Sequence, residues 1–454
     1  MMKVWGLVLC GLLMPLQVSG VGRVTIPQPS YDKACEDYVS SFFRSEMEKL
    51  RFPGLTITLI TINGLHVAKV TVLPVKSEYV PGLGIKMGIS ANVKILGNCW
   101  SILLSGLATI NVRVDCTALI LLPNYVPLST SVAVRDCRCT VALLDINISL
   151  LDIRASVTTS LGNNIVMALK VKTPVILAAC VSFGHSKLLS QINCVLPFEK
   201  GKLMYVAQTP TVTKRLIEIP VKTEYLADSG KKIPIPPLPK GFVMLPELNV
   251  TAGAIGENVF TAVLGYKIFK KPHSFPCTTH TFRDALSLEQ VVSEVIVSKC
   301  PSCTPVSSSL VIVTKLLKPL KVSLDVNLCI MNISLRLEIM DKKGSKKPLN
   351  LIALQVDLGL TAILQLVEGK VHFIASVNRV YFKLLSSVLG TVNIVRLHAP
   401  LRAFVQAVLL KEINLNLHLG KIPILQAPGL TPGMAHCHPS KRCLVCHNRV
   451  PKKG

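Results

Sequence analysis

Most apolar residues of this chain fall in long runs rich in Val and Ile, and Lys, Asn, Ser, Gly or Pro interrupts these runs every few positions. The clearest run, residues 65–73, alternates apolar and polar positions, which is typical of a strand with one buried face. Outside the N-terminus, we find no stretch that approaches the roughly 20 apolar residues of a membrane span. The sequence therefore predicts a soluble protein with many strands.

The composition of the chain points to an unusual division between interior and surface. Half of the residues are hydrophobic and the mean hydropathy is +0.50, yet the formal net charge is +25. An ordinary core does not need this much apolar surface, and the charges belong on the outside. We therefore expect a surplus apolar interior under a basic exterior, which suits a protein that takes in amphiphiles with anionic head groups.

The N-terminus predicts export. Lys3 precedes an apolar run at residues 4–16, and small residues at 18–20 offer a cleavage point, so we interpret residues 1–20 as a secretory signal peptide rather than a membrane anchor. We expect a secreted, extracellular protein in which every cysteine except Cys10 meets an environment where disulfides persist. Three N-x-S/T sequons are candidate glycosylation sites: Asn147, Asn249 and Asn332.

The length of the chain predicts two domains. A chain of 454 residues is too long for one ordinary hydrophobic core. The best boundary is residues 225–246, where several prolines among Gly and Lys fix the backbone and withdraw amide donors. We therefore predict domains at residues 21–224 and 247–430, followed by a tail at residues 431–454.

Both halves of the chain repeat one order of elements. Each half has a segment with helical spacing, a series of strand-like runs and a second helical segment. These segments are residues 31–50, 56–134 and 164–191 in the first half, and residues 282–299, 309–385 and 399–412 in the second. The repetition predicts an α+β fold that contains a duplicated helix and sheet unit.

Several segments, in their order and spacing, resemble the bactericidal/permeability-increasing protein and lipopolysaccharide-binding protein family over roughly residues 20–430. These segments are GVGRVTI (20–26), VPGLGIKMGISANVKILGN (80–98), YVAQTPTVTKRLIEIP (205–220), KPLNLIALQV (347–356) and GKVHFIASVNRV (369–380). Within the family, the apolar composition is similar to that of the BPI-fold-containing family B, long palate-lung-nasal-clone branch.

The resemblance implies two tandem tubular lipid-binding domains in an elongated boomerang. Each domain would be a long helix wrapped by a twisted antiparallel sheet, with an apolar pocket that accepts acyl chains. The resemblance also implies one disulfide in the first domain, and the matching positions are Cys139 and Cys180, with Cys137 close to the first of them. The residues that line the lipid pockets stay unknown at this point.

The end of the chain departs from the family. After residues 421–425 the family would add a final strand, but this chain continues with APGLTPGM at residues 427–434 and then a tail rich in Cys and His. We therefore expect the last strand of the second domain to be missing, as an alternative splice form or a mistaken gene model would give. The closure of that sheet is then in doubt.

The tail contains the chain's best candidates for metal ligands. They are His436, Cys437, Cys443, Cys446 and His447, with His438 beside them. These residue types and spacings fit zinc, and residues 443–447 also have the spacing of a c-haem attachment. Because the tail has no evident core around it, we favour a disordered or disulfide-bonded tail over zinc or haem, and we expect no cofactor.

Catalysis and nucleic-acid binding find little support in the sequence. We find no HExxH or GxSxG motif and no paired carboxylates in a polar frame, and Gly82, Gly84 and Gly88 miss the dinucleotide spacing. Aromatic residues make up only 5% of the chain, which does not favour base stacking. Basic runs occur at residues 267–271, 315–321, 342–347, 441–442 and 452–453.

We therefore predict a secreted lipid-binding protein that is not an enzyme. Its partners would be phospholipid or lipopolysaccharide and anionic membrane surfaces, and its setting mucosal innate defence; the oligomeric state is open. Two alternatives are a general lipid carrier without a microbial target and a zinc-binding tail on the same fold.

Overall fold

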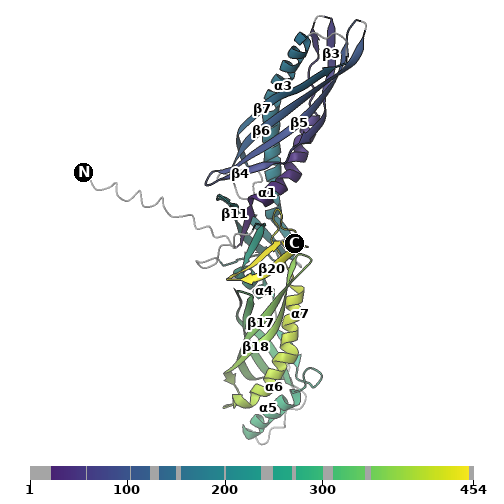
Figure 1. Ribbon diagram of the computed structural model, residues 1–454. Coiled ribbons are helices and arrows are strands. Elements are labelled where there is room, and N and C mark those ends of the chain that lie inside the picture. The colour runs from purple at the N-terminus through teal and green to yellow at the C-terminus, as the bar shows by residue number, and fades with distance from the viewer. Residues whose placement is uncertain are drawn as a thin grey trace, which may run out of the picture.

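The molecule is elongated, and three antiparallel sheets follow one another along its length (Figure 1). We call them the N-terminal, central and C-terminal sheets. The expected signal peptide and residues 237–248 of the expected linker lie outside the described residues. This computed structural model describes residues 22–57, 59–102, 104–122, 132–149, 155–198, 201–236, 249–267, 272–299, 310–342 and 349–448.

The N-terminal sheet has the strand order β2-β3-β5-β6-β7, with β4 beside β5. Along β5, buried residues alternate with polar ones, so that Met87, Val93 and Ile95 face the core while Lys86 and Lys94 face outward. The alternation of apolar and polar residues thus sets which face is covered. The strands are β2 (Leu55–Ile57), β3 (Ile60–Val72), β4 (Lys76–Val80), β5 (Gly84–Trp100), β6 (Ser105–Leu121) and β7 (Ala133–Ile148).

Two helical segments cover the buried face of this sheet. One is formed by α1 (Gln28–Cys35), η1 (Glu36–Ser40) and α2 (Ser41–Glu48); the other is the single long helix α3 (Ala155–Ile192). Helix α3 packs on β6 and β7, and Gly162 allows close approach because Leu143 and Ile146 of β7 occupy the space that a side chain would need. Both helices were predicted, and α3 begins earlier than its sequence pattern indicated.

Helix α3 also corrects an expectation. By length and composition it could cross a membrane, and no other helix of the described residues meets this test. The core helix of a soluble protein meets it too, and one third of the most apolar stretch is buried. Lys170 and Lys172 interrupt the apolar runs of this segment, so its sequence does not show one continuous apolar stretch.

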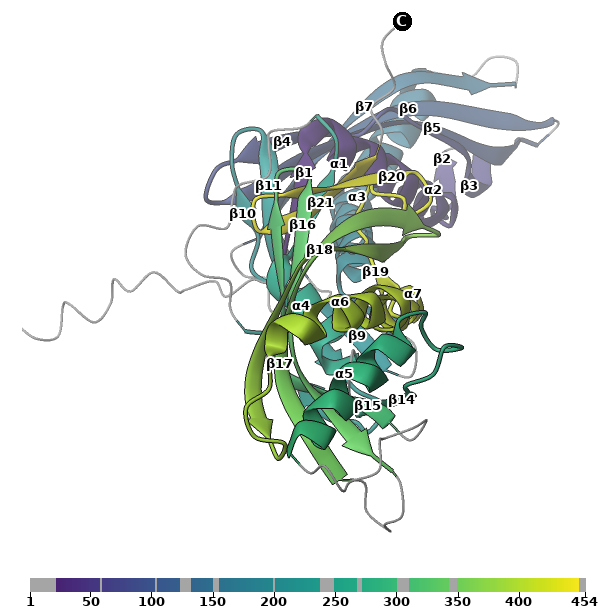
Figure 2. The same ribbon diagram turned by 90° about the horizontal axis from the view of Figure 1, so that it is seen from below.

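The C-terminal sheet has the order β14-β15-β16-β17-β18-β19 and curls around helices (Figure 2). Helix α4 packs on β15, while α6 and α7 pack on β18. The strands are β14 (His273–Pro276), β15 (Leu310–Asp325), β16 (Leu328–Asp341), β17 (Leu349–Val367), β18 (Lys370–Ser387) and β19 (Ile422–Pro423). The helices are α4 (Glu257–Lys267), α5 (Ala285–Lys299), α6 (Ile394–Phe404), η2 (Val405–Leu409) and α7 (Leu410–Leu419).

The central sheet joins distant parts of the chain. Its main order is β20-β21-β13-β1-β11-β9-β8, and β1 pairs with both β11 and β13. The mixed architecture of curled antiparallel sheets and a long helix agrees with the predicted α+β fold, whereas the division into two tandem domains stays a prediction. The strands are β1 (Gly22–Pro27), β8 (Cys194–Phe198), β9 (Gly201–Ala207), β10 (Thr211–Val212), β11 (Leu216–Leu226), β12 (Lys232–Ile233), β13 (Ala252–Gly256), β20 (Ala435–Ser440) and β21 (Cys443–Asn448).

The tail was expected to be disordered or disulfide-bonded; it is disulfide-bonded through Cys437 and Cys446, and it is ordered. Residues 435–448 form the hairpin β20–β21, and β21 extends the central sheet along β13. The turn is fixed by Arg442, whose guanidinium Nε lies 3.1 Å from Glu257 Oε1 and whose backbone amide donates to the Leu324 carbonyl. The C-terminal sheet itself ends in the short strand β19. The last strands of the described residues, β20 and β21, belong to the central sheet.

The hairpin makes a testable contribution to stability. Leu444 is fully buried in the main core, so Leu444→Ala is expected to lower the free energy of unfolding by about 2–4 kcal/mol. The matched change Lys441→Ala, at an exposed position of the same hairpin, is expected to change it by less than about 0.5 kcal/mol. Urea unfolding of both variants measures the difference; equal, negligible effects would mean that the tail is not part of the core.

Candidate functional site

An apolar cavity lies where α1, α3 and the central sheet meet, and we call it the junction cavity. Its volume is about 20 Å³, room for little more than one water molecule, since a site needs at least about 10–15 Å³ to hold one. Side chains therefore fill most of this space. The lining residues are Ile26, Tyr31, Ile85, Leu122, His185, Leu188, Leu189, Ile192, Pro210, Ile217, Ile219 and Pro428.

Only two side chains in the junction cavity have polar groups, and they satisfy each other. The Tyr31 hydroxyl lies 2.7 Å from Nε2 of His185, and both side chains are buried. Burial raises the pKa of Tyr31 well above its usual value and lowers the pKa of His185 to about 4. Both groups are thus neutral near pH 7, which keeps the cavity free of charge.

A second, larger cavity lies between the first half of α3 and the start of the N-terminal sheet, and we call it the tip cavity. Its volume is about 210 Å³. Asn164 provides the one polar side chain of its lining, which consists of Phe52, Pro53, Gly54, Leu55, Leu65, Leu161, Asn164, Ile165 and Ala168. Along α3, His185 lies twenty positions after Ile165, so the two cavities are about 30 Å apart.

Beyond the tip cavity, the far end of the N-terminal sheet exposes a group of large apolar side chains. They belong to the β2–β3 and β5–β6 turns and to the adjoining ends of β5 and β6, and the pairing of Thr61 with Trp100 brings the two turns together. No charged residue occurs in residues 98–107. We call this group the apolar tip, and its members, with exposed fractions, are Leu59 (64%), Trp100 (53%), Ile102 (74%), Leu104 (48%) and Leu107 (57%).

The apolar tip and both cavities were not predicted from the sequence. Strand-like runs were expected throughout residues 56–134, whereas Ile102 lies in the turn before β6. The signal was present, because an uncharged apolar segment that contains Trp is unusual in a strand turn. The Tyr31–His185 pair gave no such signal, since 153 intervening residues separate the two side chains in sequence.

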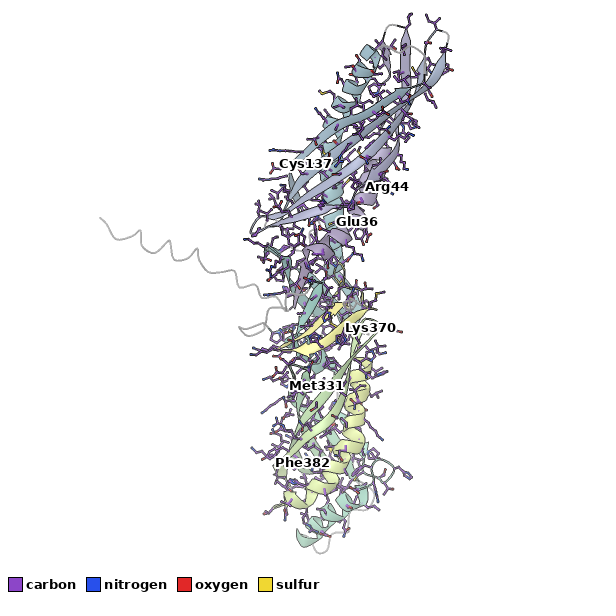
Figure 3. All side chains as sticks on the ribbon, viewed as in Figure 1. Glu36, Arg44, Cys137, Met331, Lys370 and Phe382 are labelled. Carbon is purple, nitrogen blue, oxygen red and sulfur yellow. A yellow bond between two sulfur atoms is a disulfide. The ribbon has the colours of Figure 1, made fainter. Side chains whose placement is uncertain are left out.

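The predicted disulfide between Cys139 and Cys180 is wrong. Cys139 bonds instead to Cys116, which lies directly opposite on β6 with a Cα–Cα distance of 4.1 Å. Cys180 is a buried free thiol on α3, and burial, followed by the charge of Glu46, raises its pKa to about 12. Cys137, labelled on β7 in Figure 3, is free as well.

The metal candidates of the tail are divided by the hairpin. Cys437 and Cys446 form a disulfide, and Cys443 is buried beside Ala252 and Ala254. A disulfide supplies no thiolate, so zinc or haem held by Cys437 and Cys446 is not compatible with the structure. Among the residues that the structure describes, no group of three or more His, Cys, Asp or Glu has the arrangement of a metal site.

The remaining predicted site residues of the tail are imidazoles. His436, His438 and His447 gather on one face of the hairpin, with ring centroids 5.8–6.0 Å apart. Burial, followed by the neighbouring rings of His447 and His436, lowers the pKa of His438. The cluster is therefore expected to be uncharged at His438 near neutral pH.

The three sequons differ in accessibility. Asn147 lies on the edge strand β7, and Asn249 precedes β13; both are exposed. Asn332 lies in the middle of the C-terminal sheet, between Lys321 and Gly359 of the neighbouring strands, and is half-buried. Glycosylation at each of them stays a prediction.

The buried imidazole of His185 predicts a loss of stability in mild acid. The pKa of His185 is about 4 in the folded protein instead of 6.5. Between these two pH values, the unfolded chain therefore binds a proton that the folded chain does not bind. This stability is complete above pH 6.5 and is lost as the pH falls towards 4, by about 3 kcal/mol in all. Urea unfolding at several pH values measures it, and His185→Gln is expected to flatten the profile; parallel profiles of the two proteins would contradict the assignment.

Comparisons with known proteins support the fold. No protein-family model and no curated protein matches the sequence. Among solved structures, lipopolysaccharide binding protein is similar, with a TM-score of 0.57 and 14% sequence identity over 95% of this chain and 100% of that chain. P47 proteins of Clostridium botulinum E1 and A2 also align over 95% of this chain and over 99% and 98% of theirs, at TM-scores of 0.29 and 10% identity.

The P47 scores are too low to carry an argument. The first comparison confirms the resemblance seen in the sequence at the level of the fold, and it leaves the branch of the family untested. The architecture of this chain is therefore similar to that of lipopolysaccharide binding protein.

Proposed function

We propose that the protein binds lipid by inserting the apolar tip into a lipid surface and drawing an acyl chain into the tip cavity. The observation that carries this proposal is the position of the two features. Leu55, which lines the cavity, and Leu59, which belongs to the tip, are joined by the three-residue strand β2 and its turn. Three strand residues span about 10 Å.

The energetics favour this arrangement. Each buried CH₂ group contributes about 0.8 kcal/mol, so a chain that fills an apolar cavity binds without any covalent step. Trp100 has an apolar ring and one N–H donor, which suits the boundary between lipid and water. The net charge of +25 draws the molecule towards anionic surfaces before the tip makes contact.

The junction cavity is the second candidate for an acyl chain. Because its side chains nearly fill it, a chain enters only if residues such as Leu188 and Ile192 rotate away. The uncharged Tyr31–His185 pair leaves such a chain an apolar path. We therefore place the first bound chain in the tip cavity.

Phospholipid and lipopolysaccharide are the proposed ligands, and binding without catalysis is the proposed mode. The similarity to lipopolysaccharide binding protein supports this ligand class by its fold. Secretion and a role in mucosal defence are further proposals; residues 1–20 and the disulfides found among the described residues support export.

Native mass spectrometry of the delipidated protein tests uptake. The wild type is expected to retain added phospholipid. Ala168→Phe fills the tip cavity and is expected to reduce the retained lipid at least fivefold, by taking the volume of several CH₂ groups. Ala179→Phe makes the same change at an exposed position of α3 and is expected to leave retention unchanged. Absence of lipid from the wild type would refute the proposal; equal affinity for lipid A and neutral phospholipid would favour a general carrier.

The apolar tip has its own test. Ile102→Asp places a charge where the proposal needs an inserted side chain, and it is expected to weaken binding to phosphatidylcholine vesicles by about tenfold or more, because burying one Ile side chain contributes about 1.5–3 kcal/mol. Ile374→Asp makes the same change at an exposed site of the C-terminal sheet and serves as the control. Vesicle flotation measures both; equal losses would show that the tip has no special role.

A further inference from the structure

The outer face of the C-terminal sheet contains a groove of about 770 Å³. The residues facing the helices, such as Met331 (labelled in Figure 3) and Ile333, are buried in the core, so their neighbours Asn332 and Ser334 belong to the opposite face. The groove lies in the C-terminal sheet, whereas both cavities of the proposed lipid site are lined by the N-terminal half and the central sheet. We call it the outer groove.

Strand register arranges the groove in two rows. Lys318, Ser334, Asp357 and Tyr381 are paired across β15, β16, β17 and β18 to form one row. Lys321, Asn332, Gly359 and Arg379 form the next row, two residues further along. Register shifts at Leu316/Lys318/Lys321 of β15 and at Gly359/Leu360 of β17 interrupt the ladder on both sides of the groove, and such bulges re-aim side chains.

Because Gly359 has no side chain, the floor of the outer groove has room for the side chain of Arg379. A Cβ at this position would lie 2.6–2.8 Å from the Arg379 side chain, so that side chain lies over the glycine. Arg379 thus leans into the groove from β18. Lys318 and Lys321 stand on β15, three strand spacings away, which is about 14 Å. The groove therefore has cations on two opposite sides.

These cations lack partners in the described part of the chain. Glu338 is engaged by Arg336 at 2.7 Å and by Lys315 at 3.6 Å, and Asp357 accepts a hydrogen bond from the Gln355 amide. No ion pair or hydrogen bond joins the side chain of Lys318, Lys321 or Arg379 to another described residue. An anion is the ligand that such unpaired cations favour.

The floor between the cations consists of neutral and acidic hydrogen-bonding groups. Ser334 is only 8% exposed, and its hydroxyl has no hydrogen-bond partner. A buried hydroxyl without a partner costs free energy, so a ligand that supplies one is favoured. Asn332 and Asp357 lie beside it, and the Tyr381 ring is exposed at the edge. Such groups suit the hydroxyls and the ring of a sugar.

We propose that the outer groove binds a phosphorylated sugar, free or as the head group of a lipid, with phosphates towards Lys318 and Lys321 on one side and Arg379 on the other. The floor residues bind the sugar hydroxyls. The volume of the groove exceeds what one inorganic phosphate fills, and the two separated cationic sides select a ligand with anionic groups at both ends.

Isothermal titration of the full-length protein with glucose 1,6-bisphosphate tests the proposal. The protein used has no glycan at Asn332, which lies in the groove; peptide mass spectrometry checks this. The bisphosphate is expected to bind at least tenfold more tightly than inorganic phosphate, and glucose alone is expected not to bind. Equal affinity for the bisphosphate and for inorganic phosphate would overturn the assignment to a sugar.

Matched variants separate the groove from the general charge of the sheet. Arg379→Gln, or Lys318→Gln with Lys321→Gln, removes charge-assisted hydrogen bonds and is expected to weaken binding about tenfold or more. Gly359→Ala displaces Arg379 with no change of charge and is expected to act in the same direction. Lys383→Gln removes a neighbouring exposed charge outside the groove and is expected to change affinity less than twofold. Equal losses for Arg379→Gln and Lys383→Gln would overturn the proposal.

The source of the phosphorylated sugar is decided with vesicles. Binding to phosphatidylcholine vesicles that contain phosphatidylinositol bisphosphate, with competition by glucose 1,6-bisphosphate, would assign the groove to a lipid head group. Binding of the soluble compound alone would assign it to a free sugar phosphate. The lipid-retention assay stays a separate readout, because Arg379→Gln leaves the tip cavity intact and Ala168→Phe leaves the outer groove intact.

Discussion

The pairing of β1 with both β11 and β13 is the constraint on which the rest of the structure depends. Val24 in β1 is fully buried and lies between Ile219 of β11 and Gly253 of β13. These partners come from positions about 200 residues later in the chain, so the start, middle and end of the sequence meet in one sheet. Because strand pairing satisfies every backbone group between neighbours, loss of β1 would leave two strands with unpaired edges.

The central sheet also explains how the chain can keep such an apolar composition. One continuous hydrophobic cluster runs from Phe43 and Leu161 beside the N-terminal sheet, through Val24, to Leu417 on α7. The buried face of each curled sheet packs on helices, and the charges lie on the opposite faces and in the turns. The outer groove shows this separation most clearly, since Ile333 and Ser334 are adjacent in sequence but face the core and the groove respectively.

Much of the fold could be predicted from local patterns. The alternation of residues 65–73 and the helical spacing of residues 31–50 and 164–191 depend only on near neighbours in sequence. The structure places these segments largely in β3, in α1 to α2 and in α3. The candidate site was less predictable. The tip cavity needs Leu55 and Ile165 to meet, and the junction cavity needs Tyr31 to meet His185, and no local pattern specifies either contact.

The sequence by itself determined the mixed α+β character, the strand alternation that separates apolar from basic faces, and the similarity of fold that the structural comparison supports. Only the tertiary structure decided that Cys139 pairs with Cys116, that residues 435–448 extend the central sheet, and that Lys318 and Arg379 face one groove. The physical reason is the range of the interactions. Side-chain periodicity is set within a few residues, whereas disulfides, sheet edges and grooves depend on which distant strands become neighbours.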